Sequence, residues 1–347
     1  MILEINKVNK VANILSDKSQ KIAIITHVNP DGDAIGSSLG LFNFLIQANY
    51  FGTSVITPND YASFLKWMPG NDQIIIASEN YEKASKNIIE ADIIFCLDFN
   101  DPQRTDILEK LLKKSKAKTI LIDHHPQPID IFDYTFSYVD ASSTAEIIFK
   151  FMQTIDKNNI NKNIAACLYA GIITDTGSFS YGCNNPETFI ISAELVKKGI
   201  NPENINRLVY NTYSVNRIKL LGYCLSERLT VIDKYNTAYI CLTQKDLEKF
   251  NHQEGDTEGI VNYALSIRNI HLAALFIEKK DYVKISFRSL GNIDVNYFAR
   301  KYFNGGGHVK AAGGNYYDTI SKTIEYFETV LAEFRKNNLT ITEKLKP

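Results

Sequence analysis

The residues best suited to chemistry in this chain are carboxylates and imidazoles that follow short apolar segments. His27 stands in the segment His-Val-Asn-Pro-Asp-Gly-Asp, which also contains Asp31 and Asp33. A single aspartate where a strand turns into a helix is usually a helix cap. One helix cap needs only one carboxylate, so capping does not account for two aspartates beside a histidine. The glycines of this segment lack the spacing of a dinucleotide-binding turn, and two carboxylates would repel a pyrophosphate, so we reject that interpretation.

Three later segments carry the same residue types. Asp98 ends the apolar segment IIFCLD, and Asp123-His124-His125 ends the segment that begins KTILI. Asp175 follows a helical pattern in the segment ITDTG. Neighbouring side chains on an extended segment point to opposite sides, so we expect one histidine of the pair to bind a metal and the other to reach a different target.

Four carboxylates and two imidazoles are expected to share one crevice: Asp31, Asp33, Asp98, Asp175, His27 and His124. Carboxylates at this density repel one another strongly unless cations compensate them. Oxygen-rich ligation with imidazole suits Mn²⁺, with Mg²⁺ or Co²⁺ as alternatives, better than a tetrahedral zinc site. Two such ions, about 3.5–4 Å apart, can clamp a phosphoryl group and activate water. The pattern therefore predicts phosphoester hydrolysis.

The elements that must position these residues alternate between strand and helix patterns in the first half of the chain. The predicted strands are 21–26, 53–57, 92–98 and 118–123, and the predicted helices are 34–47, 81–90 and 102–115. This alternation is typical of a mostly parallel sheet with helices on both faces, in which the carboxyl ends of the strands share one crevice.

The second half of the chain has a different pattern. Residues 143–226 are nearly all helical in pattern, and strand-like segments follow at 228–242, 270–278 and 282–289. We therefore expect an α/β protein with a catalytic domain over 1–200, a helical linker over 201–226, and a smaller α/β domain over 227–347. The active site is expected in the cleft between the two domains.

Composition excludes several classes of protein. The chain has 347 residues, too many for one compact core, and a formal net charge of −1. This charge provides no global positive field for long duplex nucleic acid or an anionic membrane. The five cysteines form no C-x-x-C pair, and no run approaches the ~18 apolar residues that a membrane span needs. We expect a cytoplasmic protein with reduced thiols.

Together, these segments resemble, in order, the four motifs of the DHH phosphoesterase superfamily, whose namesake is the triplet Asp123-His124-His125. The resemblance implies that His27, Asp31 and Asp98 hold one metal ion. It implies a second ion held by Asp33, Asp98, His124 and Asp175, with Asp98 bridging. It assigns catalysis to Asp98, Asp123 and His125, with His125 on the substrate phosphate and Asp123 fixing the histidine geometry. Arg104 is a further expected substrate contact.

The second unusual segment is Gly305-Gly306-Gly307-His308. Glycines allow a backbone to approach a ligand closely, and we expect His308 to open a helix whose N-terminal amides attract anions. A flexible turn is the alternative. Arg288 and Ser289, which end a strand pattern, are expected to contact phosphate.

These C-terminal segments resemble the DHH-associated domain that grips nucleotides. The resemblance is strongest to the branch of bacterial nano-RNases and 3′-phosphoadenosine-5′-phosphate phosphatases. It implies short RNA or nucleotide substrates and suggests a homodimer. A phosphodiesterase for linear or cyclic signalling dinucleotides is one alternative, and a catalytically silent nucleotide-binding protein is another.

Overall fold

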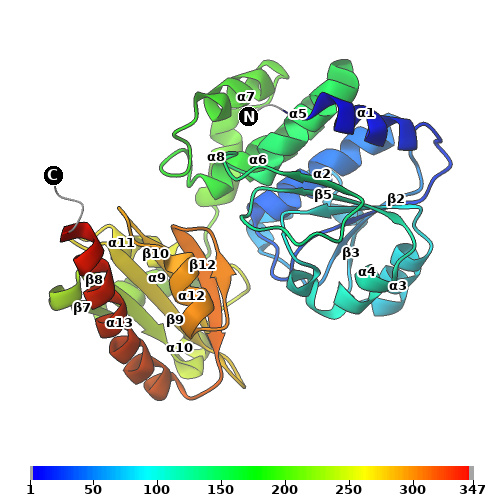
Figure 1. Ribbon diagram of the computed structural model, residues 1–347. Coiled ribbons are helices and arrows are strands. Elements are labelled where there is room, and N and C mark those ends of the chain that lie inside the picture. The colour runs from blue at the N-terminus through cyan, green and yellow to red at the C-terminus, as the bar shows by residue number, and fades with distance from the viewer. Residues whose placement is uncertain (1–2, 344–347) are drawn as a thin grey trace. The chain divides into compact units, whose positions relative to one another are not determined.

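A six-stranded parallel sheet forms the centre of the first part of the chain (Figure 1). The structure is a computed structural model that describes residues 3–343, with side chains up to residue 335. The strand order β3-β2-β1-β4-β5-β6 places the neighbours β1 and β4 at the point where the order reverses. The strands are β1 (Ile22–Ile25), β2 (Thr53–Thr57), β3 (Ile74–Ile76), β4 (Ile93–Leu97), β5 (Lys118–Asp123) and β6 (Tyr134–Ser137).

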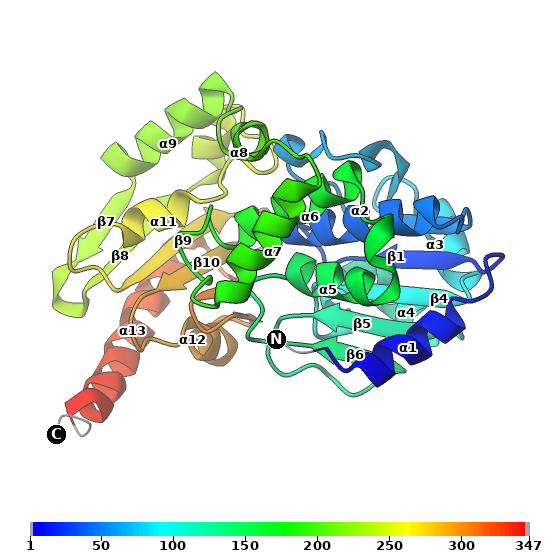
Figure 2. The same ribbon diagram turned by 90° about the horizontal axis from the view of Figure 1, so that it is seen from above.

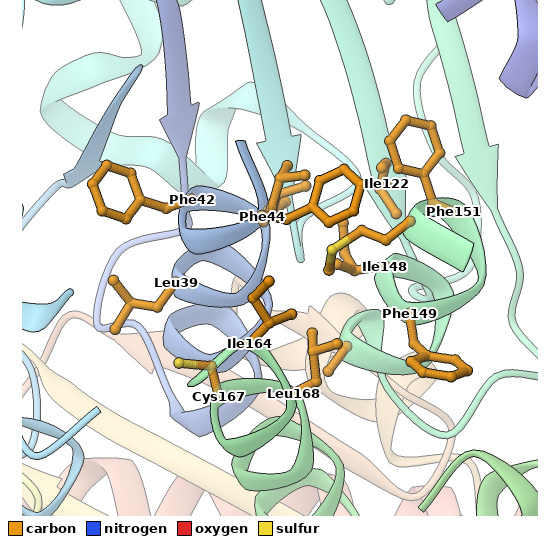
Figure 3. Packing of buried hydrophobic residues seen from close by; sticks show 14 of the residues in the cluster. Leu39, Phe42, Phe44, Ile122, Ile148, Phe149, Phe151, Ile164, Cys167 and Leu168 are labelled. Atoms are coloured by element: carbon orange, nitrogen blue, oxygen red, sulfur yellow. The ribbon is translucent and has the colours of Figure 1, made fainter. Parts of the chain in front are cut away.

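Both faces of this sheet are buried, which explains why its strands are almost continuously apolar. Ile22 and Ile24 belong to the core on one face, and Ala23 and Ile25 belong to the core on the other. Figure 3 shows side chains of the first core. The helices of that face are α1 (Ile5–Ile14), α2 (Gly32–Gln47), α5 (Thr144–Asp156), α6 (Lys162–Asp175), α7 (Pro186–Lys197) and α8 (Pro202–Tyr210); those of the other face are α3 (Tyr81–Ile89) and α4 (Glu109–Lys114).

The chain divides into two compact units, Met1–Thr212 and Tyr213–Pro347. The boundary lies inside the segment 201–226, so that α8 belongs to unit 1 and α9 to unit 2. Among the described residues, no helix has both the length and the apolar character that would let it cross a membrane.

Unit 2 contains a second six-stranded sheet of order β11-β12-β10-β9-β8-β7. Figure 2 labels its strands β7, β8, β9 and β10. Only β8 and β9 pair in parallel, and the other neighbours are antiparallel. The two α/β units confirm the predicted fold class. The elements are α9 (Val215–Glu227), β7 (Leu229–Ile232), β8 (Thr237–Leu242), α10 (Gln244–Lys249), α11 (Ile260–Leu265), β9 (Leu272–Glu278), β10 (Val283–Ser289), α12 (Val295–Tyr302), β11 (Gly306–Gly307), β12 (Ala311–Tyr316) and α13 (Ile320–Glu343).

One predicted helix of unit 1 is wrong in its detail. The segment 102–115 is not a single helix, because a 3₁₀ segment over Pro102–Leu108 precedes the short α4. Asp106 interrupts the segment with φ 49° and ψ −113°, which is far from helical geometry. The helix-like spacing of apolar residues in this segment therefore did not reveal the break.

A glycine stripe allows α2 and α6 to pack backbone against backbone. Gly32, Gly36 and Gly40 are spaced by one helical turn on α2, and a Cβ at any of them would collide with α6. A Cβ on Gly36 would lie 2.6 Å from the carbonyl oxygen of Cys167 and 2.8 Å from the amide nitrogen of Gly171. These glycines therefore set the distance between the two helices that carry Asp33 and Asp175.

We predict that Gly36→Ala destabilises unit 1 by about 1–3 kcal/mol, because the obstructing atoms are backbone and cannot move aside. Trp67, the only tryptophan in the sequence, packs against the unit 1 core, so its fluorescence during urea unfolding reports on this unit. Gly222→Ala is the control, since Gly222 lies in α9 and an added methyl group there would have no atom within 4 Å. A Gly36→Ala midpoint equal to that of the wild type would contradict the packing argument.

Candidate metal centre

The turn between β1 and α2 places His27, Asp31 and Asp33 at the carboxyl end of the central strand. Asp31 caps α2, because its Oδ1 accepts hydrogen bonds from the amides of Asp33 and Ala34, each at 3.0 Å. Asp33 is buried and caps no turn of its own helix. Its carboxylate instead accepts amide hydrogen bonds from the first turn of α5. The capping interpretation therefore accounts for Asp31 and leaves Asp33 for another role.

Asp98 follows β4 and lies between the imidazoles of His27 and His124. Its Oδ2 is 3.4 Å from His27 Nε2, and its Oδ1 is 3.6 Å from His124 Nε2. The residue has φ 65°, a left-handed conformation that is uncommon for non-glycine residues and is often found at functional sites. The two oxygens of one buried carboxylate thus face two different groups of side chains.

His124 and His125 have different nearest partners, although His124 Nε2 and His125 Nδ1 lie 3.6 Å and 3.8 Å from the same oxygen, Asp98 Oδ1. His124 Nδ1 lies 3.3 Å from the carbonyl oxygen of Ala141, and its Nε2 lies 3.3 Å from Asp175 Oδ2 and 3.8 Å from Asp33 Oδ2. His125 Nδ1 is 2.7 Å from Asp123 Oδ1. Asp123 is fully buried, so this contact fixes the ring orientation of His125.

The potential ligand atoms gather in three groups in unit 1, two of which share Asp98. Within each group, one ligand atom of every residue lies within 4.8 Å of the others. The groups are His27, Asp31 and Asp98; Asp33, His124 and Asp175; and Asp98, Asp123 and His125. The first group contains the residues expected for one ion, and the second contains three of the four expected for the other.

Hydrogen bonding at His27 tests whether a cation fits between these side chains. Nδ1 lies 2.9 Å from the carbonyl oxygen of Val28, which can only accept, so Nδ1 carries the proton in a neutral ring. Nε2 is buried and lies 3.4 Å from Asp98 Oδ2 and 4.0 Å from Asp31 Oδ1. A lone pair that faces two carboxylates is repelled by them, and a cation between the three atoms removes that repulsion. The donor set therefore fits a divalent metal ion.

Proton affinities at the site show the same excess of negative charge. Burial, followed by the charges of Asp98, Asp175 and Asp31, raises the pKa of Asp33 well above its usual range. Burial and the neighbouring Asp98 raise the pKa of Asp123 to about 7.

The pKa values of Asp98, His27 and His124 are set by the charges of their neighbours. Burial would raise the pKa of Asp98, but His27, His124 and Arg104 together lower it to about 2. Burial opposes protonation of both imidazoles, yet the adjacent carboxylates outweigh it and raise the pKa of His27 and of His124. In the metal-free protein, these side chains therefore bind protons at the positions where the surrounding negative charge favours a cation.

Arg104 and Thr144 complete the surroundings of these carboxylates. The charge of Arg104 lowers the pKa of Asp98, and its guanidinium forms no hydrogen bond or ion pair with the described residues. Thr144 donates a hydrogen bond from Oγ1 to Asp98 Oδ1 at 2.9 Å. Sequence reasoning missed Thr144, because a threonine at the start of a helical pattern is indistinguishable from an ordinary capping residue.

The candidate residues of unit 2 lie on the interior strand β10 and around the hairpin of β11 and β12. Arg288 shares one face of β10 with Lys284 and Ser286. Ser289 points to the opposite face, where it is buried and donates its hydroxyl hydrogen bond to the carbonyl of Ile293 at 2.7 Å. The structure therefore does not bring Ser289 together with Arg288.

The predicted helix after His308 is wrong. The amide of His308 donates to the carbonyl of Ala311 at 2.7 Å, and the amide of Ala311 donates back at 3.2 Å, which closes a hairpin turn between β11 and β12. Gly305 and Gly307 allow this backbone to pack closely, since a Cβ at either would collide with backbone atoms of β12. Gly306 pairs with Gly313 across the hairpin. The glycines thus serve strand packing in this unit.

Comparison with known proteins places both units in recognised families. Residues 21–172 match the model of the DHH family, N-terminal domain, and residues 234–336 match that of the DHHA1 domain. The chain is 32% identical over 308 residues to a probable bifunctional oligoribonuclease and PAP phosphatase NrnA of Streptococcus mutans, covering 88% of this chain and 93% of the relative. It is 29% identical over 320 residues to the Bacillus subtilis bifunctional oligoribonuclease and PAP phosphatase NrnA, covering 90% and 95%.

Two further relatives extend the comparison. The crystal structure of an exopolyphosphatase-related protein from Bacteroides fragilis is similar with a TM-score of 0.89 and 42% identity, covering 95% of this chain and 97% of that one. The cyclic-di-AMP phosphodiesterase GdpP of Bacillus subtilis is 27% identical over 334 residues, and the match spans 91% of this chain but 48% of GdpP.

We predict that unit 1 of the metal-free protein, held in EDTA, becomes less stable as the pH rises from about 5 to about 8. Asp33, Asp123, His27 and His124 all have raised pKa values, so the folded state binds more protons than the unfolded chain in this range. Each group contributes at most about 1.4 kcal/mol per pH unit. Urea unfolding followed by Trp67 fluorescence measures this slope.

Excess Mn²⁺ should flatten or reverse that slope, because metal ligands bind in their deprotonated forms and affinity rises with pH. The same titration with Mn²⁺ in place of EDTA provides the comparison. Identical slopes under the two conditions would show that these side chains do not hold the ion.

Proposed function

The chain belongs to the DHH family, and from this premise we propose that it is a metal-dependent phosphohydrolase of short oligoribonucleotides and of 3′-phosphoadenosine-5′-phosphate. The observation that carries the proposal is the convergence of four carboxylates and two imidazoles at the carboxyl ends of β1, β4 and β5 and at the end of α6. The names of the relatives at 32% and 29% identity support this choice of substrates.

The proposed ligands follow the groups described above. His27, Asp31 and Asp98 would hold one divalent ion, and a second would be held by Asp33, Asp98, His124 and Asp175. When bound, such ions neutralise phosphate charge and lower the pKa of water so that it becomes a nucleophile at neutral pH. Carboxylate and imidazole donors favour Mn²⁺, with Mg²⁺ or Co²⁺ as alternatives.

Other residues of unit 1 would act on the substrate itself. His125 would contact the phosphate through Nε2, because its Nδ1 is engaged with Asp123. The short contact to Asp123 holds the ring in one orientation and one tautomer, as a buried carboxylate does for a catalytic histidine. Arg104 supplies a guanidinium without a partner among the described residues, which suits a phosphate oxygen.

Unit 2 would supply contacts to the rest of the substrate. Arg288 carries the proposed phosphate contact, with Gly305, Gly306, Gly307 and His308 on the neighbouring hairpin. Ser289 is the least suited of the proposed residues, because its hydroxyl is bonded to Ile293. A net charge of −1 over the whole chain favours short substrates over long ones.

A phosphodiesterase for linear or cyclic dinucleotides is the second candidate, supported by the match to GdpP over 91% of this chain. Both candidates use the same ligand set and differ in substrate alone. A panel on the purified chain with Mn²⁺ separates them: 5′-labelled RNAs of two to about ten nucleotides, 3′-phosphoadenosine-5′-phosphate, a cyclic dinucleotide and inorganic polyphosphate.

We expect kcat/KM to be highest for the diribonucleotide and to fall with length, with phosphate release from 3′-phosphoadenosine-5′-phosphate. Faster turnover of the cyclic dinucleotide would favour the second candidate. Turnover of polyphosphate alone would overturn both, and no turnover of any substrate would favour a silent nucleotide-binding protein.

We predict that Asp98→Asn lowers kcat by at least ~10³-fold, because this carboxylate faces both ligand groups and its negative charge is lost. The amide keeps the size and tolerates the left-handed backbone, so folding should persist. Asp72→Asn, an exposed aspartate on a surface turn, is the control for charge removal. Turnover of Asp98→Asn within tenfold of the wild type would contradict the bridging role.

We predict that Arg288→Ala raises KM for the diribonucleotide about tenfold or more, as expected for the loss of a charge-assisted hydrogen bond, and leaves Mn²⁺ affinity unchanged. Arg268→Ala removes an exposed arginine of the same unit and should change neither quantity. Isothermal titration with Mn²⁺ and initial rates give the two readouts. An equal loss of metal affinity in Arg288→Ala would contradict the separate roles of the two units.

A further inference from the structure

Thr144, at the first position of α5, contacts carboxylates from two different ligand groups. Its amide nitrogen donates to Asp33 Oδ2 at 2.6 Å, and its hydroxyl donates to Asp98 Oδ1 at 2.9 Å. The amide of Ala145 completes the contact, donating to Asp33 Oδ1 at 2.9 Å. Thr144 and Ala145 are fully buried, and Asp33 and Asp98 are 1% and 2% exposed.

The local structure of α5 explains why these donors are available. Ser143 is the N-cap, and its hydroxyl accepts the amide of Glu146 at 3.2 Å. Capping is therefore accomplished without the Thr144 hydroxyl. The first amides of a helix have no partner inside the helix, and the positive end of the helix dipole favours a carboxylate there. Asp33 takes this place, although it comes from the start of another helix, α2.

The hydrogen bonds restrain the two carboxylates but do not use all the acceptor lone pairs of their oxygens. Each carboxylate oxygen has two lone pairs, and each oxygen of Asp33 accepts one of these amide hydrogen bonds. One lone pair per oxygen remains, and Asp33 Oδ2 faces His124 Nε2 at 3.8 Å. Asp98 Oδ2, which faces His27, receives no hydrogen bond from Thr144. Each carboxylate thus accepts hydrogen bonds from α5 on one side and keeps acceptor lone pairs on the side that faces a histidine.

We propose that Thr144 is a positioning residue that fixes the Asp33 and Asp98 carboxylates relative to each other, and so sets the geometry in which both metal ions are held. The inference rests on one part of the proposed function, namely that these carboxylates and imidazoles hold metal ions. Fixing both carboxylates in advance spares the reorganisation that ion binding would otherwise require, and it opposes the repulsion between them.

The test compares Thr144→Val with Thr144→Ser and Thr188→Val. Valine matches threonine in shape and removes only the hydroxyl donor, whereas serine restores that donor. Thr188 is the matched control: it is also fully buried, and its hydroxyl donates at 3.0 Å to a buried carboxylate, that of Glu146, which is not a proposed ligand. Isothermal titration with Mn²⁺ measures affinity, and urea unfolding followed by Trp67 fluorescence in EDTA measures stability.

We expect Thr144→Val to weaken Mn²⁺ binding by about 10–100-fold, the usual effect of removing a hydrogen bond to a metal ligand. Thr144→Ser should remain within about threefold of the wild type. Thr188→Val should lower the unfolding midpoint and leave Mn²⁺ affinity unchanged. Because the lost hydroxyl donates to Asp98, which is the proposed ligand of both ions, both binding steps should weaken in Thr144→Val, whereas His27→Gln should weaken one.

Three outcomes would overturn the inference: unchanged Mn²⁺ affinity in Thr144→Val, an equal loss of affinity in Thr188→Val, or a wild-type chain that binds no Mn²⁺. Failure of the proposed function has a different signature. In that case the wild type binds Mn²⁺, Thr144→Val weakens the binding, and no phosphoester of the panel is hydrolysed.

Discussion

Repulsion between buried carboxylates is the constraint on which the organisation of unit 1 depends. Asp33, Asp98 and Asp123 are all nearly inaccessible to water, and the charge of Asp98 helps to raise the pKa of both Asp33 and Asp123. Such an arrangement is costly in a medium of low dielectric constant. It persists because amides, hydroxyls and imidazoles surround the acids, and because cations can complete the charge balance.

The parallel sheet is what allows residues distant in sequence to share this environment. β1 and β4 are neighbours at the reversal of strand order, and β5 follows β4. Their carboxyl ends therefore deliver His27, Asp98 and the Asp-His-His triplet to one edge of the sheet. The glycine stripe of α2 brings α6 against it, so Asp175 reaches the same place from a helix.

Much of this arrangement could be predicted from sequence, because packing alone rarely requires an acid or a histidine directly after an apolar strand. The strand-end rule identified Asp98 and the triplet, and the resemblance to a family added their division between two ions. The short edge strands Ile74–Ile76 and Tyr134–Ser137 were missed, since three or four residues carry too little pattern. Thr144 was missed because its donors matter only in three dimensions. The helix after His308 was wrong because glycines suited to a phosphate loop suit a tight hairpin equally well.

The spread of the proposed ligand residues along the chain has a consequence for biosynthesis. The first is His27 and the last is Asp175, at the C-terminal end of α6. A ribosome that has not yet passed Asp175 carries a nascent chain in which the cluster lacks its final carboxylate. Truncated products that end before this point would contain the family's namesake triplet and still be unable to assemble the complete set of oxygen donors.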